Sequence, residues 1–154
     1  MKFSIALTID GDQNGKASLI NDFSESMKSF LKNRDYGGCI HEWLILLTIV
    51  QPPAGYEQLF KFHNPKYTEN KSRKNRFTGE VYQIFKRFDY SIQLSGDLYS
   101  RFMNGTSNES RKILADEILK SLSNFDGLSK KIEIDEIENV KKDVRLFFEE
   151  QELV

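Results

Sequence analysis

The pair His41-Glu42 is the first place where catalytic chemistry could be sought. A zinc-protease helix would need a second histidine four residues after the first, and that position is Ile45. Cys39 lies two residues before His41, so on a strand the two side chains would share one face and could act as nucleophile and base. No third group is identifiable to orient them. We therefore favour a packed cysteine beside a partly exposed histidine and predict no catalytic residues.

The segment Gly11-Asp12-Gln13-Asn14-Gly15 follows a predicted strand and precedes a predicted helix, as a phosphate-binding loop would. It lacks a Gly-Lys-Ser/Thr sequence, and the carboxylates of Asp10 and Asp12 would repel phosphate. Two carboxylates without further oxygen ligands are also a poor site for a divalent cation. We expect neither a cofactor nor a metal.

A basic segment runs from Lys61 to Arg87. It carries eight cationic residues against two acids, Glu69 and Glu80, a surplus of six. The cations are Lys61, Lys66, Lys71, Arg73, Lys74, Arg76, Lys86 and Arg87. Aromatic residues are interleaved with them, among them Phe77, Tyr82, Phe85 and, directly after Arg87, Phe88. Cations alternating with stacking platforms are typical of single-strand nucleic-acid binding. We favour instead a sheet whose aromatic residues face the core and whose loop is solvated, because half of these aromatic residues share the alternating apolar face.

The C-terminal part reverses this charge. From position 131 onward eight acids stand against four bases. The acids are Glu133, Asp135, Glu136, Glu138, Asp143, Glu149, Glu150 and Glu152, and the bases are Lys131, Lys141, Lys142 and Arg145. The net charge of the whole chain is −1, which argues against a constitutive nucleic-acid binder. Separated charge of both signs can instead steer a charged partner.

The composition is that of a folded protein with 39% hydrophobic residues and 12 Phe, and 154 residues suffice for one core. We therefore expect a single domain over residues 1–154, ending in an acidic helix at about 131–152.

One cysteine allows no internal disulfide. The N-terminal apolar stretch is too short for a signal peptide, and no segment approaches the ~20 apolar residues of a membrane span. We expect a cytoplasmic protein with no membrane contact.

Strand and helix signals follow one another in the first third of the chain. Residues 2–10 place apolar side chains at odd positions, which predicts a half-buried strand. Between Leu19 and Leu31 apolar residues recur at spacings of three and four, which predicts a helix over one face of the sheet. The apolar run from Cys39 to Val50 has no consistently polar face and predicts a central strand.

Further strands and helices are predicted after Pro52-Pro53. We expect a short strand over Tyr56–His63 as a hairpin partner, a surface loop over Asn64–Asn75 and a long strand over Glu80–Leu94. A short helical segment should follow, and Thr106-Ser107-Asn108-Glu109 predicts a capping box that starts the next helix. A last helix is expected over about Asp135 to Glu150.

Together these elements predict an α+β fold with a mainly antiparallel sheet of about four strands. One long helix should follow the first strand, and the C-terminal helices should pack nearby.

One set of segments resembles a known family. It comprises Asp35-Tyr36-Gly37 with Glu42-Trp43, the Tyr90–Leu94 strand, Phe102-Met103-Asn104-Gly105 and the Leu-rich helix ending at Leu122. These segments resemble the immunity protein 44 family of bacterial polymorphic toxin systems over roughly residues 1–122. The motif matches are Tyr36, Gly37, Glu42 and Trp43. The basic loop around Asn64–Arg76 and the acidic helix after Gly127 depart from that pattern.

The resemblance implies a protein that binds a cognate toxin domain and blocks its active site, in a contact-dependent growth inhibition or related system. It implies that the toxin is a nuclease, whose cationic site an inhibitor would meet with carboxylates. We therefore expect the contact surface to include Glu133, Asp135, Glu136 and Glu138. The alternatives are a nucleic-acid-binding domain using residues 61–87 and a small enzyme built on Cys39 and His41. The oligomeric state stays open.

Overall fold

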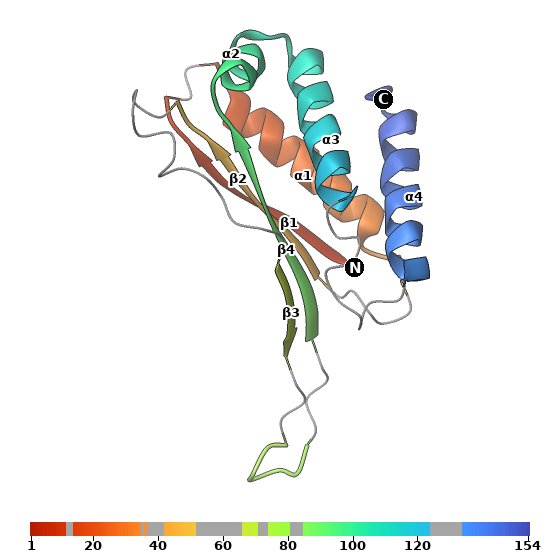
Figure 1. The fold of residues 1–154 in the computed structure, drawn as a ribbon. Coiled ribbons are helices and arrows are strands. Elements are labelled where there is room, and N and C mark those ends of the chain that lie inside the picture. The colour runs from red at the N-terminus through yellow and green to blue at the C-terminus, as the bar shows by residue number, and fades with distance from the viewer. Residues whose placement is uncertain are drawn as a thin grey trace.

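The fold is taken from a computed structural model of the 154-residue chain. The structure describes residues 1–11, 14–34, 36, 42–51, 66–70, 74–80, 85–123 and 134–154. Its elements in chain order are β1 (Lys2–Ile9), α1 (Lys16–Leu31), β2 (Glu42–Ile49), β3 (Lys66–Asn70), β4 (Phe85–Leu94), α2 (Asp97–Asn104), α3 (Ser107–Ser123) and α4 (Ile134–Glu150). The helices lie on one face of the sheet (Figure 1).

The sheet has the strand order β1-β2-β4-β3. β1 runs parallel to β2, with Phe3 opposite Trp43, and β2 runs parallel to β4. Only β3, at the edge, pairs antiparallel, with Tyr67 opposite Phe88. The prediction of a mainly antiparallel sheet is therefore wrong, although the fold is α+β overall. The physical reason is the crossover: a helix between β1 and β2 returns the chain to the same end of the sheet, so both strands run the same way.

Two predictions around the middle of the chain have different outcomes. The surface loop expected over Asn64–Asn75 is wrong where β3 forms, because residues 66–70 pair with β4 along their whole length. Polar composition does not prevent pairing at a sheet edge, where one side of the strand stays in water. The strand expected over Tyr56–His63 lies outside the described residues.

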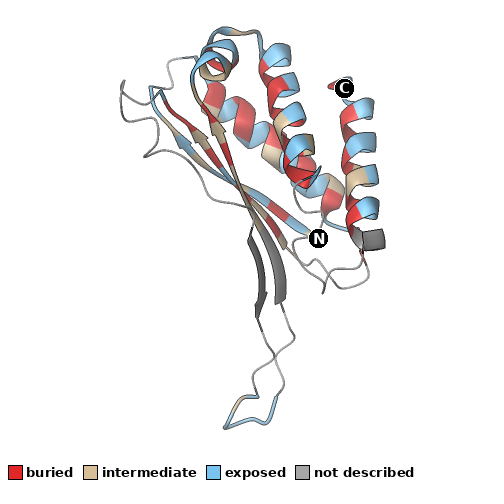
Figure 2. Cartoon of the chain, in the orientation of Figure 1, coloured by how far each residue is buried: buried red, intermediate tan, exposed pale blue. Residues whose placement is uncertain are grey.

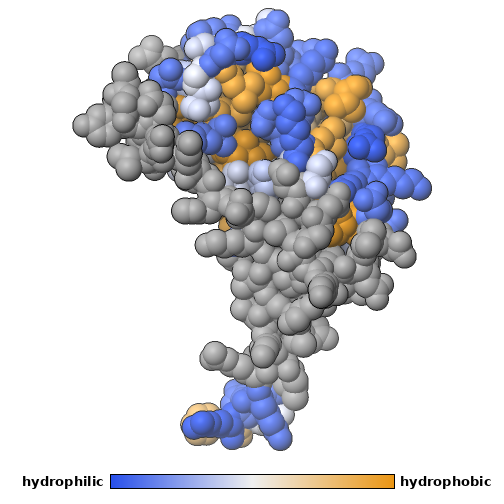
Figure 3. Space-filling model, in the orientation of Figure 1, coloured by the Kyte–Doolittle hydropathy of each residue, from blue (hydrophilic) through white to orange (hydrophobic). Residues whose placement is uncertain are grey.

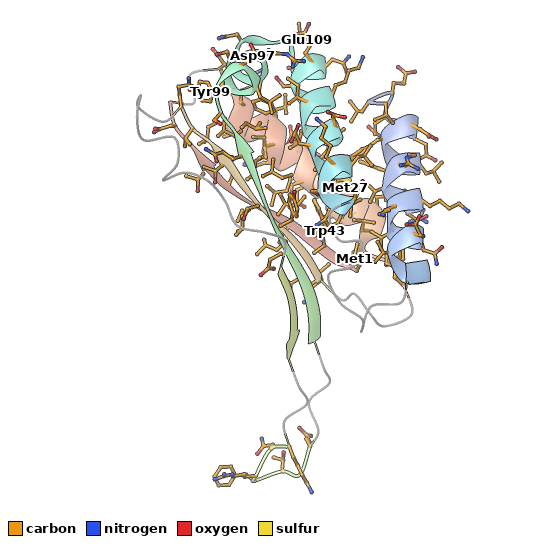
Figure 4. All side chains as sticks on the ribbon, in the orientation of Figure 1. Met1, Met27, Trp43, Asp97, Tyr99 and Glu109 are labelled. Carbon is orange, nitrogen blue, oxygen red and sulfur yellow. The ribbon has the colours of Figure 1, made fainter. Side chains whose placement is uncertain are left out.

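The core lies between the sheet and the helices. Alternation along β2 directs Trp43, Ile45, Leu47 and Ile49 to the helix side, where each is at most 1% exposed. Figure 2 shows the buried residues gathered on the sheet face and helix faces that meet each other, and Figure 4 shows Trp43 and Met27 between these layers. On the other side of β2, Leu46 is 40% exposed. Among the described residues, the helices therefore bury only one face of the sheet.

The C-terminal helices complete this core, as predicted. α3 begins with the expected capping box: the Thr106 N–H donates to Glu109 Oε2 (2.8 Å), and the Glu109 N–H donates to Thr106 Oγ1 (3.2 Å). α4 packs against α1 through two ring pairs, Phe147 on Phe30 and Phe148 on Phe23, with centroids 4.9 and 5.8 Å apart. α4 is thereby part of the core.

A polar joint connects the start of α1 to the corner between α2 and α3. Asn14 Nδ2 donates to the Met103 carbonyl (2.8 Å), and Lys16 Nζ donates to the Gly105 carbonyl (2.8 Å). Lys16 Nζ also donates to Ser110 Oγ (2.8 Å), whose hydroxyl donates to the Phe102 carbonyl (2.6 Å). Carbonyls at the end of a helix have no partner within that helix. These side chains satisfy the last carbonyls of α2 and so fix the corner.

Lys16 is 4% exposed, so its ammonium group depends on these partners for its hydrogen bonds. We predict that Lys16→Met lowers the free energy of unfolding by about 1–3 kcal/mol, because buried polar acceptors lose a donor. Urea denaturation measures this loss. The control is Lys28→Met, whose side chain is 56% exposed in a pair with Glu25 and should cost less than about 1 kcal/mol. Equal or greater stability of Lys16→Met would contradict a structural role for the ammonium group.

Candidate partner-binding surfaces

The motif residue Tyr36 belongs to a partly buried cluster that holds α4 near the end of α1. Its hydroxyl donates to Asp143 Oδ2 on α4 at 2.7 Å, and the side chain is 5% exposed. Arg34 Nη1 pairs with Asp143 Oδ1 at 3.2 Å, and its guanidinium lies over the Phe30 ring at 4.2 Å. Burial, followed by the hydrogen bond to Asp143, raises the pKa of Tyr36 well above its usual value. Tyr36 therefore positions α4.

The motif pair Glu42-Trp43 forms the first two residues of β2. Trp43 is 1% exposed and packs edge-on against Phe3, with ring centroids 5.0 Å apart. Its indole N–H is buried and has no hydrogen-bond partner among the described residues. Glu42 is half-buried and helps to line a hollow of about 610 Å³. The structure thus places Tyr36 and Trp43 in the core, while Gly37 lies outside the described residues.

Three of the four carboxylates predicted as a contact surface lie at the start of α4. Asp135 and Glu136 lie in its first turn, and Glu133 lies outside the described residues. Glu138 is exposed and pairs with Lys141 at 3.1 Å. The exposed residues that follow on α4 are neutral or basic and include Lys142 and Arg145, before acids return at the helix end. The acidic character of the described helix is therefore concentrated at its two ends.

The segment 74–80, here called the hairpin tip, lies between β3 and β4 and stands away from the helices (Figure 1). Asn75 Oδ1 accepts the N–H groups of Phe77 (2.8 Å) and Thr78 (3.4 Å), and the Asn75 N–H donates to the Glu80 carbonyl (2.8 Å). Gly79 has φ +72°, a conformation that favours glycine. Phe77 is 98% exposed. The expectation that the aromatic residues of this segment face the core is wrong for Phe77.

The described surface offers no catalytic centre that we can identify. No group of three or more His, Cys, Asp or Glu that could hold a metal occurs within the described ranges. The Cys39 and His41 pair and His63 lie outside them, as does Asp12. None of the helices that the structure describes has both the length and the apolar character needed to cross a membrane.

These features describe a small α+β protein whose exposed charged surfaces, rather than a catalytic cluster, are the candidate sites. Comparison with protein families agrees with this class: the model of the family described as immunity protein 44 matches residues 1–150. The chain belongs to the immunity protein 44 family. The match includes the acidic α4, which the sequence resemblance over residues 1–122 had left outside. No curated protein and no solved structure matched the chain.

Sequence reasoning missed the partner of Tyr36 and the exposure of Phe77. Asp143 lies 107 positions from Tyr36, so no local pattern links them. A signal for Phe77 was present, because Asn75 and Gly79 flank it and both residue types are common in turns. A turn at the end of a hairpin has no sheet face toward which an aromatic side chain could point.

The raised pKa of Tyr36 predicts a pH-dependent contribution to stability. The folded state keeps the phenol proton above the ordinary pKa of about 10, where the unfolded state loses it. The contribution is therefore complete below about pH 10 and declines above it, by at most about 1.4 kcal/mol per pH unit. We predict that Tyr36→Phe lowers stability at neutral pH by about 1–3 kcal/mol and lacks this alkaline decline.

Urea denaturation at about pH 8 and about pH 11 measures both effects for the wild type and the variant. Tyr99→Phe is the matched control, because its hydroxyl makes only a long 3.4 Å hydrogen bond to the Asp10 carbonyl. An identical alkaline decline in the wild type and in Tyr36→Phe would contradict the role given to this phenol.

Proposed function

We propose that this immunity protein binds a cognate toxin domain, a nuclease, and neutralises it by occluding its active site. The observation that carries the proposal is the family match over residues 1–150. The described polar clusters at Lys16 and Tyr36 are explained by their contacts between helices and need no catalytic role. This supports a binding role. We further propose a single domain in the cytoplasm that acts in a contact-dependent growth inhibition or related system.

The proposed contact surface comprises Glu133, Asp135, Glu136 and Glu138, the last three of which lie at the start of α4. A nuclease binds a polyanion and is expected to have a cationic site, to which carboxylates are complementary. α4 is anchored by Tyr36 at Asp143 and by its ring contacts with α1. A surface on an element held in this way needs little ordering on binding, which lowers the entropic cost of association.

The direct test of the function uses the protein encoded immediately upstream of this chain as the probe. Its C-terminal domain is expressed with and without this chain, and growth and complex formation are measured. We expect arrested growth without the chain, and rescue with a stable one-to-one complex when the chain is present. Normal complex formation without rescue would contradict neutralisation, and absence of both would contradict the assignment to this toxin.

The contact surface has its own prediction. Reversing Glu133, Asp135, Glu136 and Glu138 to Lys should slow association by about tenfold or more and weaken protection, with the largest effect at low salt. Stopped-flow association and growth rescue measure the two effects.

The matched control reverses three exposed acids, Glu149 and Glu150 at the other end of the same helix and Glu152 just after it. It should change association much less. Lysines at the start of α4 oppose the helix dipole, so thermal unfolding of both variants is measured as well. An unchanged association rate in a folded four-site variant would rule out this surface, and equal slowing in both variants would show a general charge effect.

A further inference from the structure

The hairpin tip exposes an aromatic side chain that the fold does not use. Exposed large apolar side chains in the described residues are Leu46, Phe77, Leu146 and Val154, at 40%, 98%, 41% and 58%. Three of these keep part of their surface in contact with the protein, and Phe77 keeps almost none. Its apolar surface therefore contributes nearly nothing to folding, although burying a Phe is worth about 1.5–3 kcal/mol.

The turn that carries Phe77 is held by its own hydrogen bonds. The side chain of Asn75 accepts two backbone N–H groups, the Gly79 N–H donates to the Asn75 carbonyl at 3.0 Å, and Thr78 Oγ1 accepts the Glu80 N–H at 3.4 Å. These bonds define the backbone on both sides of Phe77. A turn backbone held in this way needs little further ordering on binding, and an aromatic side chain presented on it suits a role as an interface anchor.

The charges beside Phe77 indicate what kind of surface it would meet. Lys74 and Arg76 are exposed and form no ion pair within the described residues, and Glu80 is the tip's acid. The hydrophilic surface of this segment stands out at one end of the molecule in Figure 3. Interface centres are enriched in aromatic residues and Arg. An apolar pocket with carboxylates on its rim complements this arrangement.

Two other occupants fit less well. The hollow of about 610 Å³ on this chain's own surface has Lys2, Lys28 and Lys32 in its lining, which would repel the tip of a second copy. Single-stranded nucleic acid is usually held by several stacking platforms along a cationic groove. The described tip offers one ring, and the side chains of Asn75 and Thr78 already serve the turn.

We propose that the hairpin tip is a second contact with the toxin domain, in which Phe77 enters an apolar pocket rimmed by carboxylates. This rests on the proposed function, because the partner is the same toxin. The tip and the start of α4 carry opposite charge, so together they would fit a partner that presents an acidic pocket and a cationic site. Two contacts of opposite sign restrict both orientation and partner choice.

The test measures the affinity of the full chain for the upstream-encoded toxin domain by calorimetry. Phe77→Ala should raise Kd by at least about tenfold, as truncation of an interface anchor does. Phe77→Trp should retain most of the affinity, since it keeps an aromatic group.

The double variant Lys74→Glu with Arg76→Glu should slow association, mainly at low salt. Val154→Ala, an exposed apolar truncation at the C-terminal end, is the control and should leave Kd unchanged.

The outcomes separate this proposal from the function on which it rests. Absence of a wild-type complex would overturn both, whereas a wild-type complex with unchanged affinity in Phe77→Ala overturns only the tip contact. Thermal unfolding of Phe77→Ala should match the wild type, because the side chain is 98% exposed. A labelled single-stranded oligonucleotide should not bind. Salt-sensitive oligonucleotide binding that is lost in Phe77→Ala would overturn the protein-pocket proposal in favour of nucleic acid.

Discussion

The apolar layer between one face of the sheet and the helices is the constraint on which the rest of the structure depends. β2 lies inside the sheet and directs its largest side chains, including Trp43, into this layer. α1 and α4 close the layer through their phenylalanine contacts. Besides these ring contacts, two polar clusters near the ends of α1 link it to α2 and to α4.

These two polar clusters fix how the helices are arranged relative to one another. At one end of α1, Lys16 and Asn14 satisfy the carbonyls that end α2. At the other end, Arg34 and Tyr36 hold Asp143 of α4. Buried polar groups of this kind are costly unless they are paired, so they favour one arrangement of the helices over others. The orientation of the proposed toxin-binding surface on α4 depends on the cluster of Arg34, Tyr36 and Asp143.

Local structure was largely predictable from the sequence, and the arrangement of strands was not. Alternation in residues 2–10, the spacing of apolar residues in α1, the Thr106–Glu109 capping box and the last helix all identified real elements. Strand direction depends on the route between strands, and the pairing of β2 with β4 crosses a segment containing β3. The Tyr36–Asp143 contact is equally non-local. Phe77 lies in a turn outside the strand predicted over Glu80–Leu94, so no alternation pattern specified where its side chain points.

We propose that this chain inhibits a toxin by presenting two surfaces of opposite charge, the start of α4 and the hairpin tip. Amide hydrogen exchange, followed by mass spectrometry on the free chain and on its complex with the upstream-encoded toxin domain, tests the claim most directly. We predict that complex formation slows amide hydrogen exchange in residues 74–80 and in the first turns of α4, with little change along α3. Slowed exchange confined to α3, or to the sheet face away from the helices, would contradict it.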